Sequence, residues 1–217
     1  MTDDISFFTT ELLKWSEKEK KIYPWRKEKD SYKKLVAEIM LQRTKTNQVL
    51  PVYESFIKKY SNINSLSSAR RYEIDKFFSK LGLMWRSKLL MDLANYIKTN
   101  LNGIIPSTRD ELLKVPGVGD YIADAMLVFA FNKKRTIIDG NVVRLVSRFF
   151  GIEKKGEMRR NSKFIDFCQQ LSRNLEMKNI KNLNYGLIDF GASVCKPHPL
   201  CGVCQLSTKC QYFRKRK

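Results

Sequence analysis

The sequence predicts an all-α protein. Apolar residues recur three or four positions apart in many separate stretches, beginning with Phe8, Leu12 and Trp15, as they do on the buried face of a helix. We find no convincing alternation of apolar and polar residues, the pattern that would indicate half-buried strands. A chain of 217 residues with 43% hydrophobic residues can bury a substantial core, either as one domain or as two small lobes.

The expected helices follow one another along the whole chain. A first amphipathic helix covers residues 5–20, residues 23–27 break the pattern, and residues 30–31 offer caps for the next helix. Ser107 or Thr108 caps a later one. We interpret the remaining apolar stripes as core rather than as cofactor sites. They lie at residues 35–40, 49–60, 77–81, 89–97, 122–129, 142–149 and 164–175.

The charge of the chain indicates an anionic partner. Forty-one Lys and Arg against 22 Asp and Glu leave a formal net charge of +19, which favours a polyanion, and generic RNA binding fits this charge as well as DNA binding does. No apolar run approaches eighteen residues, so we expect no membrane partner. The first residues do not resemble a signal peptide, which predicts a cytoplasmic, reducing location, at the nucleoid in a prokaryote.

A glycine-rich break separates two of the expected helices. Pro116, Gly117 and Gly119 interrupt the helical pattern, which resumes at residues 122–129, so the unit is predicted to be helix, hairpin, helix. Glycine allows positive φ and close approach of the backbone, so the amides of Gly117, Val118 and Gly119 can bind a phosphate at the helix N-terminus. A plain turn between packed helices explains the same residues.

Asp139 stands between two apolar segments. It follows Thr136-Ile137-Ile138 and precedes the amphipathic run that begins at Val142, which is the position of a helix N-cap. Capping alone would account for an aspartate there.

Four cysteines lie close together near the C-terminus. Cys195, Cys201, Cys204 and Cys210 are spaced C-x5-C-x2-C-x5-C. A reducing location argues against disulfides, so the four thiolates are candidate ligands of one metal centre, either structural zinc or an iron-sulfur cluster. Cys168 lies on an apolar helix face and is predicted to belong to the core.

Two motifs together resemble a known family. The motif Leu-x-x-Pro-Gly-Val-Gly at residues 113–119, followed by Ile-Asp-Gly-Asn-Val-x-Arg at residues 138–144, is similar to the helix-hairpin-helix, Gly/Pro/Asp superfamily of DNA glycosylases. The resemblance covers nearly the whole chain and is nearest to the adenine and thymine mismatch glycosylases of the endonuclease III branch. It implies two helical lobes with a DNA cleft between them. These would be a six-helix barrel at residues 30–132, and a terminal domain formed by residues 1–29 and 133–217.

The resemblance also favours iron-sulfur over zinc. Members of the family carry a [4Fe-4S] cluster at C-x6-C-x2-C-x5-C, after a segment like residues 183–191, and this chain departs from that spacing by one residue in the first loop. That loop reaches DNA in relatives, and here it offers Lys196 and His198 as phosphate neighbours. We expect the cluster to be structural, because base excision requires no electron transfer.

Catalytic roles follow from the same match. Asp139 would stabilise the oxocarbenium-like sugar or help water to attack it, and Glu38 would protonate the departing base directly or through water. A lone helical Glu is usually solvated, but the apolar neighbours of Glu38 predict partial burial and a raised pKa. Tyr121 stands where bifunctional relatives have a lysine, so we predict a monofunctional glycosylase that leaves an abasic site.

The target base is a separate question. Leu83 is the expected plug in the duplex, Arg43 is expected opposite the orphaned base, and Gln42-Arg43-Thr44 approaches the Arg-Arg-Thr of thymine enzymes. Adenine glycosylases usually add a C-terminal domain, whereas this chain ends seven residues after Cys210. We therefore expect a monomer that removes thymine or uracil opposite guanine from double-stranded DNA.

Three alternatives stay open at this point. The first is an adenine glycosylase that acts on A:G or A:8-oxoguanine pairs. The second is a helix-hairpin-helix protein that binds DNA without catalysis, for which a net charge of +19 would suffice. The third is a zinc-containing RNA-binding protein.

Overall fold

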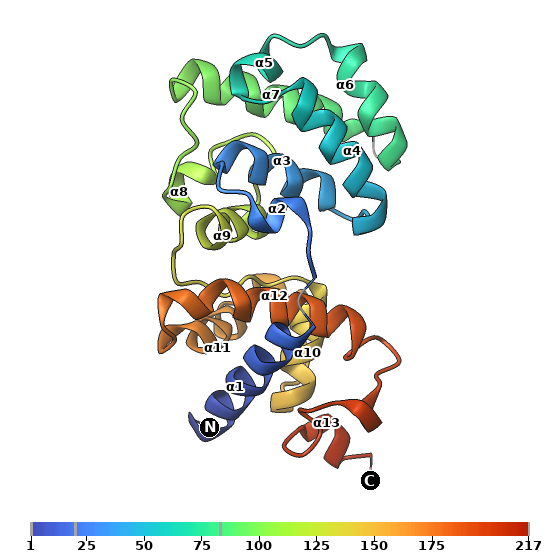
Figure 1. Ribbon diagram of the computed structural model, residues 1–217. Coiled ribbons are helices and arrows are strands. Elements are labelled where there is room, and N and C mark those ends of the chain that lie inside the picture. Colours follow the sequence, from blue (N-terminus) through green and yellow to red (C-terminus); the bar gives the residue numbers. More distant parts are fainter. Residues whose placement is uncertain (1, 20, 83, 217) are drawn as a thin grey trace. The chain divides into compact units, whose positions relative to one another are not determined.

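A computed structural model describes residues 2–19, 21–82 and 84–216, and every regular element in this part of the chain is a helix. This confirms the predicted all-α fold (Figure 1). The chain divides into two compact units, a central unit at Ile22–Phe131 and a terminal unit that joins Met1–Lys21 to Asn132–Lys217. Among the described residues, no helix has the length and hydropathy needed to span a membrane.

The central unit is built around α3 (Ser31–Leu41), which packs against α4, α7 and α9. Leu35, Val36, Ile39 and Met40 of α3 are at most 1% exposed and form the middle of its core. The remaining elements are α2 (Pro24–Lys27), α4 (Thr46–Lys59), α5 (Ile63–Ser67), α6 (Arg71–Phe78), the 3-10 helix η1 (Ser79–Leu81), α7 (Trp85–Asn100), α8 (Arg109–Leu112) and α9 (Asp120–Phe129).

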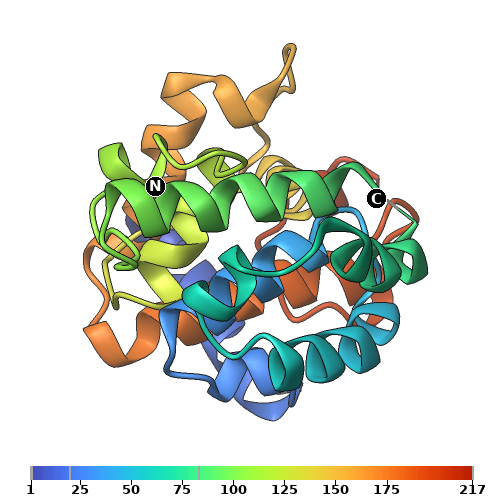
Figure 2. The same ribbon diagram turned by 90° about the horizontal axis from the view of Figure 1, so that it is seen from above.

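Local sequence explains how α3 begins. Asp30 caps it, because its Oδ1 accepts hydrogen bonds from the amides of Tyr32 and Lys33. The preceding stretch, which we expected only to break the helical pattern, forms the single turn α2, and its Trp25 is buried in the core of the central unit. Residues 22–29 therefore lie in this unit. Figure 2 shows α7, in green, with α5 packed against it.

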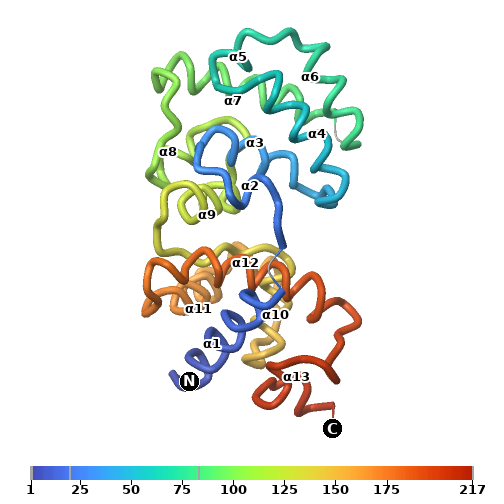
Figure 3. Tube along the Cα trace, in the orientation of Figure 1, coloured from blue at the N-terminus to red at the C-terminus, as the bar shows by residue number. Residues whose placement is uncertain are grey.

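The terminal unit packs α1 (Thr2–Lys18) and α10 (Gly140–Phe150) against α12 (Met177–Ser193). Its core includes Phe8 and Leu12 of α1 and Cys168, all 0% exposed. The other elements are η2 (Met158–Arg160), α11 (Ser162–Arg173), η3 (Cys201–Val203) and α13 (Gln211–Arg214). In Figure 3 the chain leaves α12, forms the loop that carries the clustered cysteines, and ends with α13 beside α10.

An extended segment leads into α10 and is held by side-chain amides. Asn184 accepts a hydrogen bond from the Ile137 amide at 2.7 Å and donates one to the Arg135 carbonyl at 2.9 Å. Gln169 accepts a hydrogen bond from the Thr136 amide at 2.9 Å and donates one to the Thr136 carbonyl at 3.0 Å. Buried backbone groups must be paired, so these two amides position the start of α10.

Candidate active site

The predicted hairpin joins α8 to α9. Thr108 is the N-cap of α8, and the chain reverses at Gly117, whose φ of 81° lies in the left-handed region. A Cβ at Gly117 would also collide with the side chain of Leu89, so conformation and packing both require glycine there. A Cβ on Gly119, the N-cap of α9, would meet no atom within 4 Å. Gly119 therefore leaves open surface where we expect a phosphate to approach.

Glu38 and Tyr121 are brought together inside the central unit. Glu38 lies on α3 and is 7% exposed, and its carboxyl group is hydrogen-bonded to Tyr121 of α9. Its Oε2 atom makes no hydrogen bond within the described part of the chain. Lys34, one helical turn earlier, is also buried and donates to the carbonyl of Trp25 at 3.2 Å.

The environment of Glu38 favours its protonated form. Burial raises the pKa of its carboxyl group from 4.5 to about 7, although Lys34, Arg26 and the hydrogen bond from Tyr121 all act to lower it. A carboxyl group with a pKa near neutrality can hold a proton and release it to a leaving group. The raised pKa expected from the apolar neighbours of Glu38 is thus present.

Asp139 belongs to the terminal unit and caps α10, as the sequence predicted. Its Oδ1 accepts from the Val142 amide at 2.7 Å, and its Oδ2 accepts from Asn141 Nδ2 at 2.9 Å. The side chain is partly exposed. Capping needs only one carboxylate oxygen, so the second bond restricts the rotation of the group.

The bond from Asn141 continues toward the cysteine loop. Arg144 donates to Asn141 Oδ1 at 2.8 Å, to the Gly191 carbonyl at 2.7 Å and to the Cys195 carbonyl at 2.7 Å. Two side chains therefore connect the carboxylate of Asp139 to the backbone of the first clustered cysteine. Both stand in the motif at residues 138–144, but the sequence alone did not reveal their partners.

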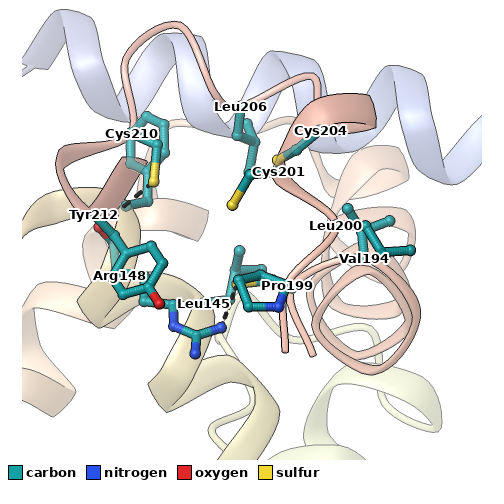
Figure 4. A pocket seen from close by; sticks show the side chains of 12 residues that line it. Leu145, Arg148, Val194, Pro199, Leu200, Cys201, Cys204, Leu206, Cys210 and Tyr212 are labelled. Carbon is teal, nitrogen blue, oxygen red and sulfur yellow. Dashed lines mark hydrogen bonds between the residues drawn. The ribbon is translucent and has the colours of Figure 1, made fainter. Parts of the chain in front are cut away.

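The four clustered cysteines line one pocket between α10 and α13. Figure 4 shows the side chains of Cys201, Cys204 and Cys210 around this space, with Leu145 on its wall. In the described residues, no three His, Cys, Asp or Glu side chains are placed to bind one metal ion. Four thiols around a shared space form the donor set that a four-iron cluster takes.

Arg148 binds the backbone of the loop between Cys195 and Cys201. Its guanidinium donates to the carbonyls of Lys196 at 2.6 Å and Pro197 at 2.9 Å, and lies 3.6 Å from Cys195 Sγ. Lys196 is partly exposed, and His198, one residue beyond Pro197, is exposed. The loop is therefore held by its backbone while these two side chains remain accessible.

The other residues predicted to contact nucleic acid are Gln42, Arg43 and Leu83. Gln42 is partly exposed and Arg43 is exposed in the turn after α3, whereas Leu83 lies outside the described residues. We did not assign roles from sequence to Asn141, Arg144 or Arg148. The contacts of Arg144 and Arg148 with the cysteine loop and with Gly191 join positions about fifty residues apart, and no local pattern signals them.

Known proteins resemble this chain over most of its length. The family pattern of HhH-GPD superfamily base excision DNA repair proteins matches residues 36–170. A thymine/uracil-DNA glycosylase of Pyrobaculum aerophilum is 34% identical over 220 residues, which cover 99% of this chain and 95% of that protein. An adenine DNA glycosylase of Buchnera aphidicola is 34% identical over 214 residues, which cover 97% of this chain but 59% of that protein.

Solved structures agree with these relatives. A thermostable thymine-DNA glycosylase superposes with a TM-score of 0.92 at 30% identity, covering 99% of this chain and 98% of that one. An endonuclease III in complex with DNA has a TM-score of 0.82 at 22% identity and covers 100% of this chain and 98% of its own, so it shares the fold.

Replacing Glu38 by glutamine should stabilise the protein at alkaline pH. A raised folded-state pKa means that the folded chain binds the proton more tightly, so wild-type stability falls as pH rises from 4.5 to about 7. Glu38→Gln has no such pH-dependent loss. At pH 8 its free energy of unfolding should therefore exceed that of wild type by roughly 3 kcal/mol. Chemical denaturation at pH 4.5 and pH 8 measures the difference, with exposed Glu54→Gln as the control. Equal stability changes at both pH values would contradict the assignment.

Proposed function

The chain belongs to the HhH-GPD superfamily of base excision DNA repair proteins, and from this we propose that it is a DNA N-glycosylase that removes thymine or uracil mispaired with guanine. The observation that carries the proposal is the match to two thymine/uracil-DNA glycosylases, which this chain covers to 95% and 94% of their length. We further propose that the central unit corresponds to the six-helix barrel of the family, and that the terminal unit corresponds to its iron-sulfur domain.

The proposed reaction breaks an N-glycosidic bond in a nucleotide turned out of the duplex. Positive charge develops on the sugar, and we assign Asp139 to stabilise it, because two donors already orient its carboxylate. Negative charge develops on the departing base, and we assign Glu38 to neutralise it with the proton that its buried carboxyl group holds near pH 7.

We propose that the enzyme is monofunctional. A strand-cleaving glycosylase needs an amine that forms a Schiff base with the sugar, and the corresponding position here holds the phenol of Tyr121. The hydrogen bond between Tyr121 and Glu38 supports a different role, which is to orient the proton donor. The product would be an abasic site in an uncut strand.

We propose that Cys195, Cys201, Cys204 and Cys210 hold a [4Fe-4S] cluster. Their arrangement around one pocket supports this, as does Arg148, whose positive charge lies beside Cys195 Sγ and would offset the charge of the thiolates. When bound, the cluster would supply a rigid cross-link for the loop at residues 195–210. The residues of the chain perform the excision chemistry in this scheme.

Adenine removal is the second candidate. An adenine DNA glycosylase of 34% identity matches 97% of this chain. According to the resemblance, Glu38 and Tyr121 occur in both classes. This chain spans 59% of the length of that relative.

A panel of duplexes tests the target base. Incubation with T:G, U:G, A:G and A:8-oxoguanine duplexes, followed by alkaline cleavage, should give product from T:G and U:G only. Product from the adenine pairs alone would replace the first candidate by the second. No product from any duplex would leave a DNA-binding protein without glycosylase activity.

Asp139→Asn should separate catalysis from folding. Asparagine caps a helix about as well as aspartate, so thermal stability and duplex binding should stay within about 1 kcal/mol of wild type. Loss of the negative charge beside the sugar should lower the single-turnover excision rate by about 100-fold or more. An unchanged rate in the folded variant would remove Asp139 from the reaction.

Tyr121→Lys should introduce strand cleavage. A lysine here would present an amine to the sugar, and sodium borohydride should then trap a covalent DNA adduct that wild type never forms. Tyr121→Phe is the matched control, since it also lacks the hydroxyl but has no amine. If Tyr121→Lys excises the base without forming an adduct, our placement of this residue is wrong.

The cysteine cluster predicts a coloured protein. Protein purified without oxygen should be brown and contain iron, because four thiolates hold the iron-sulfur cluster. Cys204→Ser should lose the colour and the thermal stability that the cross-linked loop provides. Cys168→Ser should keep the colour, since Cys168 is 0% exposed and is not among the residues that line the pocket. A colourless wild-type protein that contains zinc would refute the assignment.

A further inference from the structure

A fully buried arginine lies outside the chemistry assigned so far. Arg86, in the first turn of α7, is 0% exposed and is the largest of the fully buried side chains in the described residues. No carboxylate of the described chain forms an ion pair with it. Burial, and then the like charge of Arg43, lower the pKa of Arg86. A buried cation without a counter-ion is destabilising, so hydrogen bonds from its guanidinium must offset part of this cost.

One guanidinium nitrogen holds the end of α3. Arg86 Nη1 donates to the Met40 carbonyl at 3.1 Å and to Thr44 Oγ1 at 3.0 Å. Met40 lies in the last turn of α3, where backbone carbonyls have no partner within the helix. A positive charge is also favourable at a helix C-terminus. Arg86 therefore acts as a cap supplied from another helix.

The two acceptors stand on either side of a strained residue. Arg43 has a φ of 54°, in the left-handed region that residues other than glycine rarely adopt. Such a conformation persists where the surrounding structure holds it. Thr44 Oγ1 also donates a hydrogen bond to the Gln42 carbonyl at 3.3 Å. Through Met40 and Thr44, Arg86 therefore holds the chain before and after Arg43.

We propose that Arg86 is a positioning residue that holds the Gln42-Arg43-Thr44 turn in the conformation that reads the base opposite the excised one. The inference rests on the proposed function, in which Arg43 enters the duplex opposite the orphaned guanine. The guanidinium donors of Arg43 match the acceptors of guanine, whereas adenine presents an amino donor in place of one of them. Arg43 is exposed, and the backbone conformation of the turn sets the direction in which its side chain leaves the protein.

A purely structural role for Arg86 makes a different prediction. Loss of packing around α3 would lower excision from every duplex by the same factor. Loss of the turn conformation would instead lower the preference for guanine as the opposite base. The ratio of excision rates from U:G and U:A duplexes separates the two.

The test measures that ratio under single-turnover conditions. Wild type should prefer U:G, and Arg86→Met should lower the ratio about tenfold or more. Arg86→Lys should restore most of the ratio, since one nitrogen makes both hydrogen bonds.

A double variant tests whether the two arginines act together. Arg43→Ala/Arg86→Met should be no less selective than Arg43→Ala alone, because both substitutions act on the same turn. Exposed Arg71, which pairs with Asp75 on α6, gives the matched control Arg71→Met.

Several results would overturn the inference. An unchanged ratio in folded Arg86→Met would do so, as would additive effects in the double variant or equal wild-type rates on U:G and U:A. If Arg86→Met does not fold, Thr44→Val removes one acceptor and keeps the buried arginine, and it must lower the ratio in the same direction. Absence of excision from every duplex by wild type would instead defeat the proposed function, and the inference with it.

Discussion

The pairing of an extended segment by two side-chain amides is the constraint on which the candidate site of the terminal unit depends. Backbone groups at residues 135–137 are bonded by Asn184 and Gln169, which come from α12 and α11. Buried peptide groups that lack a partner are strongly destabilising, so these bonds determine where the segment ends. The next helix begins there, and Asp139 is its N-cap.

The same carboxylate then serves two purposes. As a cap, Asp139 satisfies the Val142 amide, and the contact with Asn141 fixes its second oxygen. A carboxylate that is already oriented loses little freedom when charge develops beside it, which is the condition for electrostatic catalysis. Arg144 extends this arrangement to the backbone of Cys195, so α10 orients the proposed catalytic group at one end and the proposed cluster loop along its length.

Local features were predictable from the sequence, and distant ones were not. The caps Asp30, Thr108 and Asp139 depend on the amides that directly follow them, so each could be identified from its neighbours. Burial of Glu38 could likewise be expected from the apolar residues around it. The role of Arg86 could not be predicted, because its acceptor Met40 lies 46 positions away. A buried arginine without an ion-pair partner also contradicts the usual preference of arginine for exposure.

The packing of α3 connects recognition with chemistry in the central unit. Glu38 lies near the end of this helix, and the turn that carries Arg43 follows directly after it, so both positions move with the same element. The core supports two groups that oppose folding, a carboxyl group with an unbonded oxygen and a cation without a counter-ion. Leu35, Val36 and Ile39, buried on the same helix, supply apolar burial that offsets this cost. A helix held this firmly fixes the separation between the proposed proton donor and the proposed reader of the opposite base, and both therefore depend on one rigid segment.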